Sequence, residues 1–97
     1  MKSTNGYLTL LRQYMDSHAG KYGIVRMGIF GSVARGKQTE NSDVGICFEA
    51  PAPNLLTLAR IKFDLEALLG SRVDLVRLRD RMDEYLKRNI EKEALYV

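Results

Sequence analysis

The chain has 97 residues, of which 45% are hydrophobic and 28% charged, and its formal net charge is +3. This length forms one domain with a modest core, and the composition is typical of a globular protein. The charge is too small to indicate nucleic-acid binding by itself, and no segment approaches the roughly 20 apolar residues of a membrane span. No signal-peptide pattern is present, and the single cysteine, Cys47, cannot form an internal disulfide. We therefore expect a cytoplasmic protein.

The first predicted element is a helix from about Thr4 to His18. Ser3, Thr4 or Asn5 caps its start, and Gly20 is expected to end it. His18, the only histidine, is expected to be a helix-end residue rather than a metal ligand or a base. Helical spacing of apolar side chains predicts the buried face, which contains Leu8, Leu11 and Met15.

An apolar run from Ile24 to Phe30 predicts a strand that ends at Gly31-Ser32. Glycine lets backbone N–H groups approach a ligand closely, and Ser32 is a good N-cap for a short helix after it. Because a helix N-terminus presents unpaired N–H groups, this turn suits an anion such as a triphosphate. Arg35 and Lys37 add positive charge nearby. An ordinary strand-to-helix turn and simple surface charge are the alternatives.

Two acidic residues lie at or inside apolar strands. A second strand is predicted over residues 43–49, with Asp43 at its start, and Asp74 lies within a third strand over residues 72–77. A buried carboxylate is costly unless it is paired or binds a metal. If both converge beside the Gly31-Ser32 turn, they form a Mg²⁺ site for phosphoryl or nucleotidyl chemistry. Cys47 shares a strand face with Asp43; we expect a buried structural cysteine, with a site-lining thiol as the alternative.

Two further helices complete the pattern. Asn54 caps a helix over about residues 55–69 that Gly70 ends, and a closing helix runs over about residues 81–95. Strands that alternate with helices predict a small α/β (α+β) domain over residues 1–97, with a mixed β-sheet and helices packed mainly on one face. The expected inward-facing residues are Leu58, Ile61, Leu65 and Leu68 in the earlier helix and Met82, Tyr85, Leu86 and Ile90 in the closing helix.

The combination of Gly31-Ser32, Ala34-Arg35-Gly36, Ser42 and Asp43-Val44-Gly45 resembles a family signature. It is similar to that of the minimal nucleotidyltransferases of the DNA polymerase beta superfamily, of the MntA-like antitoxin type. The resemblance covers nearly the whole chain, through to the closing segment Glu93–Val97.

This resemblance implies a polymerase-beta-like nucleotidyltransferase fold. It also implies that Gly31, Ser32 and Arg35 bind a nucleotide. Asp43 and Asp74 would be catalytic residues and would hold metal, with two Mg²⁺ ions as the expected cofactors.

One position departs from the signature. The family pattern ends in Asp-x-Asp, and the second aspartate is replaced here by Gly45, which leaves Asp43 and Asp74 of three expected carboxylates. Loss of a bridging ligand should lower the affinity for one ion by at least the roughly 10- to 100-fold that is typical when residues around metal ligands are lost. No fold-level reason for Gly45 is visible in the sequence, so we expect activity to be reduced or absent.

The resemblance implies transfer of a nucleoside monophosphate, AMP from ATP or from another nucleoside triphosphate, to an acceptor hydroxyl. The implied acceptor is a HEPN-type helical protein, with this chain as the antitoxin of a toxin–antitoxin system. A non-catalytic antitoxin that acts by complexing its helical partner is the alternative. The sequence also leaves open whether the chain forms a homo-oligomer. A small basic nucleic-acid binder is the third hypothesis; because aromatics make up only 8% of the chain, we expect no direct nucleic-acid binding and no membrane association.

Overall fold

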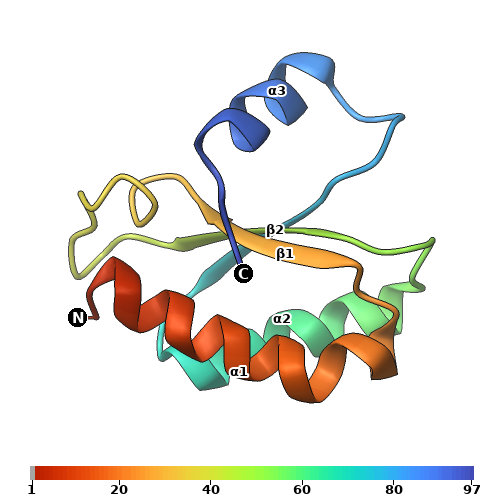
Figure 1. Cartoon of the computed structure of the whole chain (residues 1–97), viewed down its shortest axis with the longest axis horizontal. Coiled ribbons are helices and arrows are strands. Elements are labelled where there is room, and N and C mark those ends of the chain that lie inside the picture. Colours follow the sequence, from red (N-terminus) through yellow and green to blue (C-terminus); the bar gives the residue numbers. More distant parts are fainter. Residues whose placement is uncertain (1) are drawn as a thin grey trace.

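The computed structural model describes residues 2–97, which form three helices and a four-stranded sheet (Figure 1). The strand order is β3-β2-β1-β4; β2 and β3 are parallel, and β1 is antiparallel to both of its neighbours. The mixed α+β architecture predicted from the sequence is confirmed. In chain order the elements are α1 (Thr4–Tyr22), β1 (Arg26–Phe30), β2 (Val44–Glu49), α2 (Leu55–Leu69), β3 (Val73–Arg77), α3 (Glu84–Glu93) and β4 (Leu95–Tyr96).

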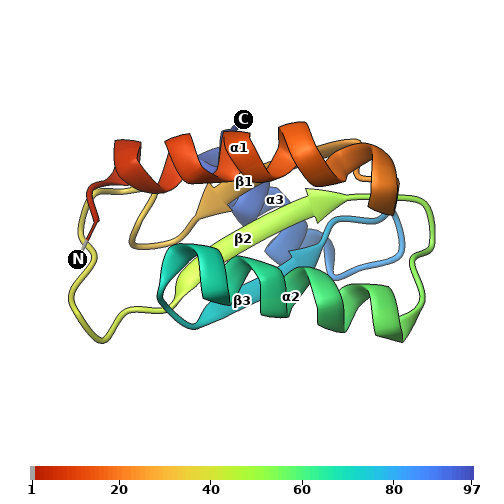
Figure 2. The ribbon, with the colours of Figure 1, turned by 90° about the horizontal axis from the view of Figure 1, so that it is seen from below.

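Helices α1 and α2 lie side by side across one face of the sheet (Figures 1 and 2). Alternate residues of β2 point toward these helices, because successive side chains of a strand face opposite sides. They form the main core with apolar residues of both helices. The fully buried members of this core include Leu11, Ile46, Phe48, Ile61 and Leu65.

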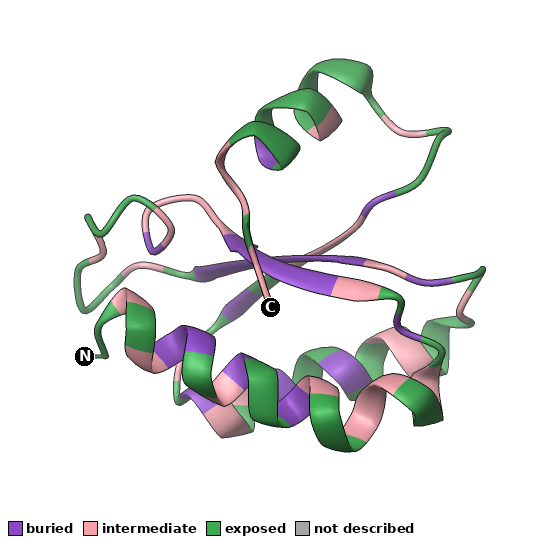
Figure 3. Cartoon of the chain, viewed as in Figure 1, coloured by how far each residue is buried: buried purple, intermediate pink, exposed green. Residues whose placement is uncertain are grey.

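Helix α3 lies on the opposite face and covers only part of it (Figures 1 and 3). Ile90 is its only buried residue, and it packs with Cys47 and Leu78. The prediction that Tyr85 and Leu86 face inward is wrong, since they are 79% and 46% exposed. The reason is that α3 buries a side chain only near its C-terminal end, so its first turns project into solvent.

Two element boundaries differ from the predictions because of capping. Helix α1 continues past Gly20 to Tyr22 and is capped by Gly23, whose φ of +68° is the left-handed conformation that glycine adopts without strain. Helix α3 begins at Glu84 instead of Arg81, because the Asp83 carboxylate accepts a hydrogen bond from the Leu86 N–H at 2.9 Å.

The expected caps of α2 are confirmed, and the last strand was not predicted. Asn54 accepts a hydrogen bond from the Thr57 N–H at 2.8 Å, and Gly70 follows the helix with φ +68°. The short β4 pairs with β1 and extends the sheet. Two residues are too few to show the alternating pattern of a strand. None of the helices within residues 2–97 combines the length and the apolar character needed to cross a membrane.

Candidate functional site

The segment after β1 forms a series of hydrogen-bonded turns and not the predicted short helix. The Arg35 N–H donates to the Gly31 carbonyl oxygen at 3.2 Å, and the Lys37 N–H donates to that of Ser32 at 2.9 Å. Gly31 and Gly36 bracket the segment with φ of +80° and +69°. A helix between two such residues is too short to propagate, so Ser32 does not act as an N-cap.

The turn is attached to the core and to α1. Val33 is 1% exposed and belongs to the main core. The Thr4 hydroxyl donates to the Val33 carbonyl oxygen at 2.6 Å. Both contacts set the position of the Gly31–Gly36 turn relative to the sheet, while Arg35 and Lys37 remain exposed.

Glu93, the last residue of α3, brings its carboxylate onto this turn. The Gly31 N–H donates to Glu93 Oε1 at 2.9 Å, and Arg35 Nη1 lies 2.9 Å from Glu93 Oε2. A backbone N–H and a guanidinium group thus converge on one anion, a donor pair that also suits a phosphate group. Glu93 was not among the site residues predicted from the sequence; its only signal was its place in the closing segment that resembles the family.

The two acids and Gly45 lie on the same face of the sheet as α3. Val44 and Val73 belong to the core on the opposite face, and Gly45 pairs with Asp74 across the parallel strands. Asp43 directly precedes β2, with its side chain 53% exposed and its Oδ1 3.4 Å from Arg72 Nε. Asp74 is also exposed, so the expectation that it is buried is wrong: it lies on edge strand β3. Neither carboxylate therefore needs a metal for the domain to fold.

The end of β1 brings the turn and the acids together. Phe30 pairs with Gly45 in the antiparallel ladder, so Gly31 begins the turn directly beside the strand that Asp43 precedes. Gly31, Arg35, Asp43 and Asp74 therefore border one region of the sheet face, and Ser32 lies in the same turn.

Phe30 gives position 45 a structural reason to be glycine. A Cβ on Gly45 would lie 2.8 Å from the Phe30 carbonyl oxygen and 3.0 Å from two carbons of its ring. The expectation that the fold supplies no reason for Gly45 is therefore corrected. The ring packs where a side chain at position 45 would leave the strand.

The available donors match one divalent cation better than two. Among residues 2–97, no three His, Cys, Asp or Glu side chains are grouped so that they could hold a metal ion. Mg²⁺ is commonly held by one or two carboxylates together with substrate phosphates, and the two carboxylates predicted for this role are Asp43 and Asp74. Two bridged ions require a further carboxylate, and Gly45 lacks one.

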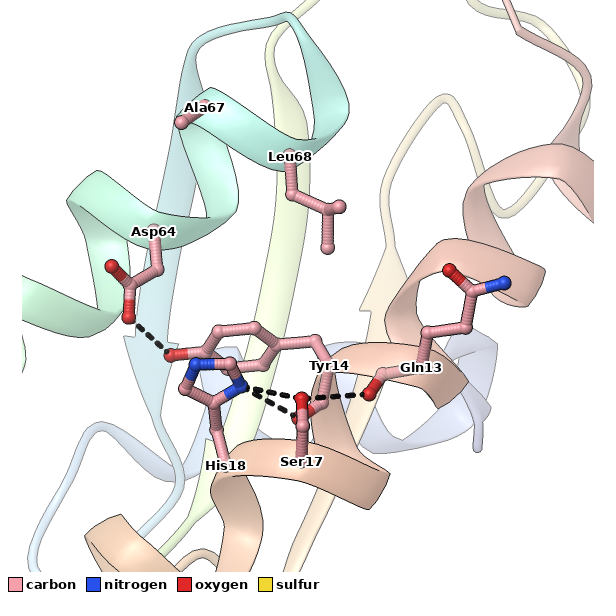
Figure 4. A pocket seen from close by; sticks show the side chains of 7 residues that line it. All are labelled: Gln13, Tyr14, Ser17, His18, Asp64, Ala67 and Leu68. Carbon is pink, nitrogen blue, oxygen red and sulfur yellow. Dashed lines mark hydrogen bonds between the residues drawn. The ribbon is translucent and has the colours of Figure 1, made fainter.

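Cys47 and His18 lie outside this region. Cys47 is fully buried, its S–H donates to the Gly28 carbonyl oxygen at 3.7 Å, and burial raises the pKa of the thiol. His18 stacks on Tyr14, with ring centroids 4.3 Å apart, in a groove of about 510 Å³ between α1 and α2 (Figure 4). That groove is on the helical side of the sheet, away from the Gly31 turn. Because Cys47 is buried and His18 lies in this other groove, neither residue belongs to the candidate site.

A family model described as "Nucleotidyltransferase domain" matches residues 9–97. The chain belongs to this family. Protein adenylyltransferase MntA of Thermococcus cleftensis is 37% identical over 78 residues, which cover 79% of this chain and 78% of the relative. The resemblance derived from the Gly31-Ser32 and Asp43 signature is confirmed.

Solved structures support the same fold. One described as a candidate minimal nucleotidyltransferase has a TM-score of 0.79 and 36% identity, covering 97% of this chain and 95% of that chain. A toxin–antitoxin crystal structure with AMP-PNP has a TM-score of 0.72 and 25% identity, covering 98% and 72%. The sheet with its helices therefore has the nucleotidyltransferase fold.

Proposed function

We propose that the chain is the antitoxin of a HEPN-type partner protein and transfers AMP from ATP to a hydroxyl group of that partner. The observation that carries this proposal is the convergence of the Gly31 N–H and Arg35 on one anion, the Glu93 carboxylate, at the end of the sheet where Asp43 precedes β2 and Asp74 lies on β3. The name of the Thermococcus relative and the AMP-PNP in the toxin–antitoxin structure support the choice of reaction and nucleotide.

In the proposed reaction, Gly31, Ser32 and Arg35 bind the β- and γ-phosphates and so orient the α-phosphorus. Asp74 accepts the proton of the acceptor hydroxyl. The acceptor oxygen then forms a bond to the α-phosphorus, the bond from that phosphorus to the bridging oxygen breaks, and pyrophosphate leaves. Mg²⁺ held by Asp43 and Asp74 would neutralise charge on the triphosphate.

Gly45 is expected to make this reaction slow or to abolish it. The site has two carboxylates, and Asp43 also lies near the cation Arg72. With fewer negative ligands, a divalent cation should bind more weakly and at higher concentration. We expect Mn²⁺, which follows Mg²⁺ in its preference for oxygen ligands, to support transfer at least as well, and EDTA to prevent it.

The test measures transfer of label from α-³²P-ATP to HEPN-type helical proteins offered as acceptors. It compares the wild-type chain with Gly45→Asp and with Gly45→Ala, which adds the Cβ without the carboxylate. Because that Cβ meets Phe30, the wild type and both variants are first compared for folding by circular dichroism. Label transfer by Gly45→Asp but not by Gly45→Ala assigns the gain to the carboxylate. If no folded variant labels any acceptor, the transferase proposal is wrong.

A non-catalytic antitoxin is the second candidate, and the Phe30 ring over Gly45 favours it. This packing fills the space that a third ligand needs, and a domain without transferase activity still offers exposed surface for a partner. It predicts that the helical partner is bound and inhibited equally with and without ATP. Inhibition of the partner that requires ATP to be cleaved between its α- and β-phosphates would contradict this candidate.

A further inference from the structure

We propose that Glu93 is an internal competitor for the nucleotide: its carboxylate holds the anion site of the Gly31 turn and leaves when a triphosphate binds. This inference rests on the proposed function for the identity of the nucleotide. The contact itself lies within this chain and needs no partner protein. It joins the last residue of α3 to a turn 62 residues earlier in the sequence.

The geometry of the contact is that of a bound anion. Each carboxylate oxygen of Glu93 has its own donor, the Gly31 N–H for Oε1 and Arg35 Nη1 for Oε2, both at 2.9 Å. Hydrogen bonds in which the donor or the acceptor is charged are about twice as strong as neutral ones, which explains why the carboxylate occupies this place.

A phosphate group cannot share the Gly31 N–H with Glu93. The turn has one N–H at Gly31, and it points to Glu93 Oε1. A triphosphate beside a carboxylate also places like charges together, which is unfavourable at short range. Binding of a phosphate at Gly31 and Arg35 therefore requires that Glu93 moves away.

The position of Glu93 allows it to move without opening the core. It ends a helix of which only Ile90 is buried, and its side chain is 32% exposed. The main core on the covered face of the sheet does not include Glu93, and neither does the hydrogen bond from Thr4 to Val33 that holds the turn. The energy of the Glu93 contact is thus subtracted from the affinity for the nucleotide, since only the open form binds.

The first test compares ATP affinity in Glu93→Gln and Glu91→Gln, measured by calorimetry with Mg²⁺. Both variants remove one negative charge from α3, but Glu91 pairs with Arg26 at 3.2 Å and does not contact the turn. Glu93→Gln should bind ATP on the order of tenfold more tightly than wild type, because its neutral amide competes less well for both donors. Glu91→Gln should remain within about twofold. An equal or lower affinity in folded Glu93→Gln would instead make Glu93 a residue that organises the turn, and would overturn the proposal.

The wild-type chain gives a second test that needs no substitution. On titration with inorganic tripolyphosphate, NMR should show the Glu93 side-chain carboxyl carbon moving to the position of a free glutamate. The Gly31 amide proton should shift over the same concentration range. A Glu93 signal that stays unchanged while Gly31 shifts shows that both anions bind together, which contradicts competition. If neither signal moves, the turn does not bind phosphate and the proposal is equally wrong.

These outcomes are separate from the transferase proposal. Tighter binding by Glu93→Gln without label transfer to any acceptor would support the competition and reject the transferase. Label transfer with unchanged affinity of Glu93→Gln would do the reverse.

Discussion

The aromatic ring of Phe30 lies across Gly45, its direct partner in the β1–β2 ladder. A Cβ at position 45 would lie 3.0 Å from two ring carbons and 2.8 Å from the Phe30 carbonyl oxygen. An aromatic side chain that covers a glycine on the neighbouring strand compensates for the packing that glycine lacks. The two positions are therefore coupled, and the residue at 45 affects both the chemistry and the stability of the domain.

Gly45→Ala should lower the free energy of unfolding by roughly 1–3 kcal/mol, because the added methyl overpacks the strand pair against Phe30. Urea denaturation measures the change. Gly20→Ala is the control: outside the neighbouring residues and the local helix backbone, no atom lies within 4 Å of a Cβ at this position in α1. It should raise stability by about 0.5–1 kcal/mol through helix propensity. A Gly45→Ala chain as stable as the wild type would show that Phe30 can move aside at no cost.

Tyr14→Phe should destabilise the contact between α1 and α2. The Tyr14 hydroxyl donates to Asp64 Oδ2 at 3.1 Å, and burial together with Asp64 raises the pKa of Tyr14 well above its usual range (Figure 4). The hydroxyl thus stays a donor, and this contribution is lost only as the pH rises above the ordinary tyrosine pKa. We expect Tyr14→Phe to lower the free energy of unfolding by about 1–2 kcal/mol at neutral pH.

Tyr22→Phe is the matched control for that prediction. Tyr22 donates to the same Asp64 oxygen at 3.5 Å, the outer limit for a hydrogen bond. Its loss should change the urea midpoint less than that of Tyr14. Equal effects of both substitutions would mean that the hydrogen-bond length does not decide the energy here.

Cys47 should react slowly with a disulfide reagent in the folded protein. Burial raises the pKa of its thiol, which keeps it protonated, and its side chain is inaccessible. At pH 8 we expect labelling about 100-fold or more slower than in urea, because reaction requires opening of the core. Because the pKa of the Cys47 thiol is higher in the folded than in the unfolded chain, the stabilisation from the buried neutral thiol is present at neutral pH and is lost as the pH rises. Fast stoichiometric labelling of the native chain would place Cys47 at the surface.

Arg72→Gln should change metal binding more than stability. Arg72 and Asp43 are both largely exposed, so their 3.4 Å contact should contribute less than about 1 kcal/mol. Removing the cation beside Asp43 should strengthen Mn²⁺ binding by about two- to fivefold, measured by electron paramagnetic resonance. Arg60→Gln, the same charge change on exposed α2, should have no such effect. Equal effects of both would indicate a general response to net charge.

Much of the fold was predictable because it depends on neighbours in the chain. The strand that ends at Phe30, the caps Asn54 and Gly70, and the buried stripe of α2 all follow from local patterns. The predictions for α3 failed where periodicity alone was used. Tyr85 and Leu86 have helical spacing with Ile90, but spacing does not reveal whether another element reaches that face.

The sequence by itself determined the order of the elements, the Gly31-Ser32 turn and the family, since these depend on residue type and short spacing. Only the tertiary structure decided that Glu93 completes the anion site and that Phe30 occupies the space beside Gly45. The physical reason is that both contacts join segments that the sheet brings together. Strand β1 pairs with β2 and with β4, and α3 leads directly into β4. Contacts of this kind depend on register and packing, which no local pattern of residues encodes.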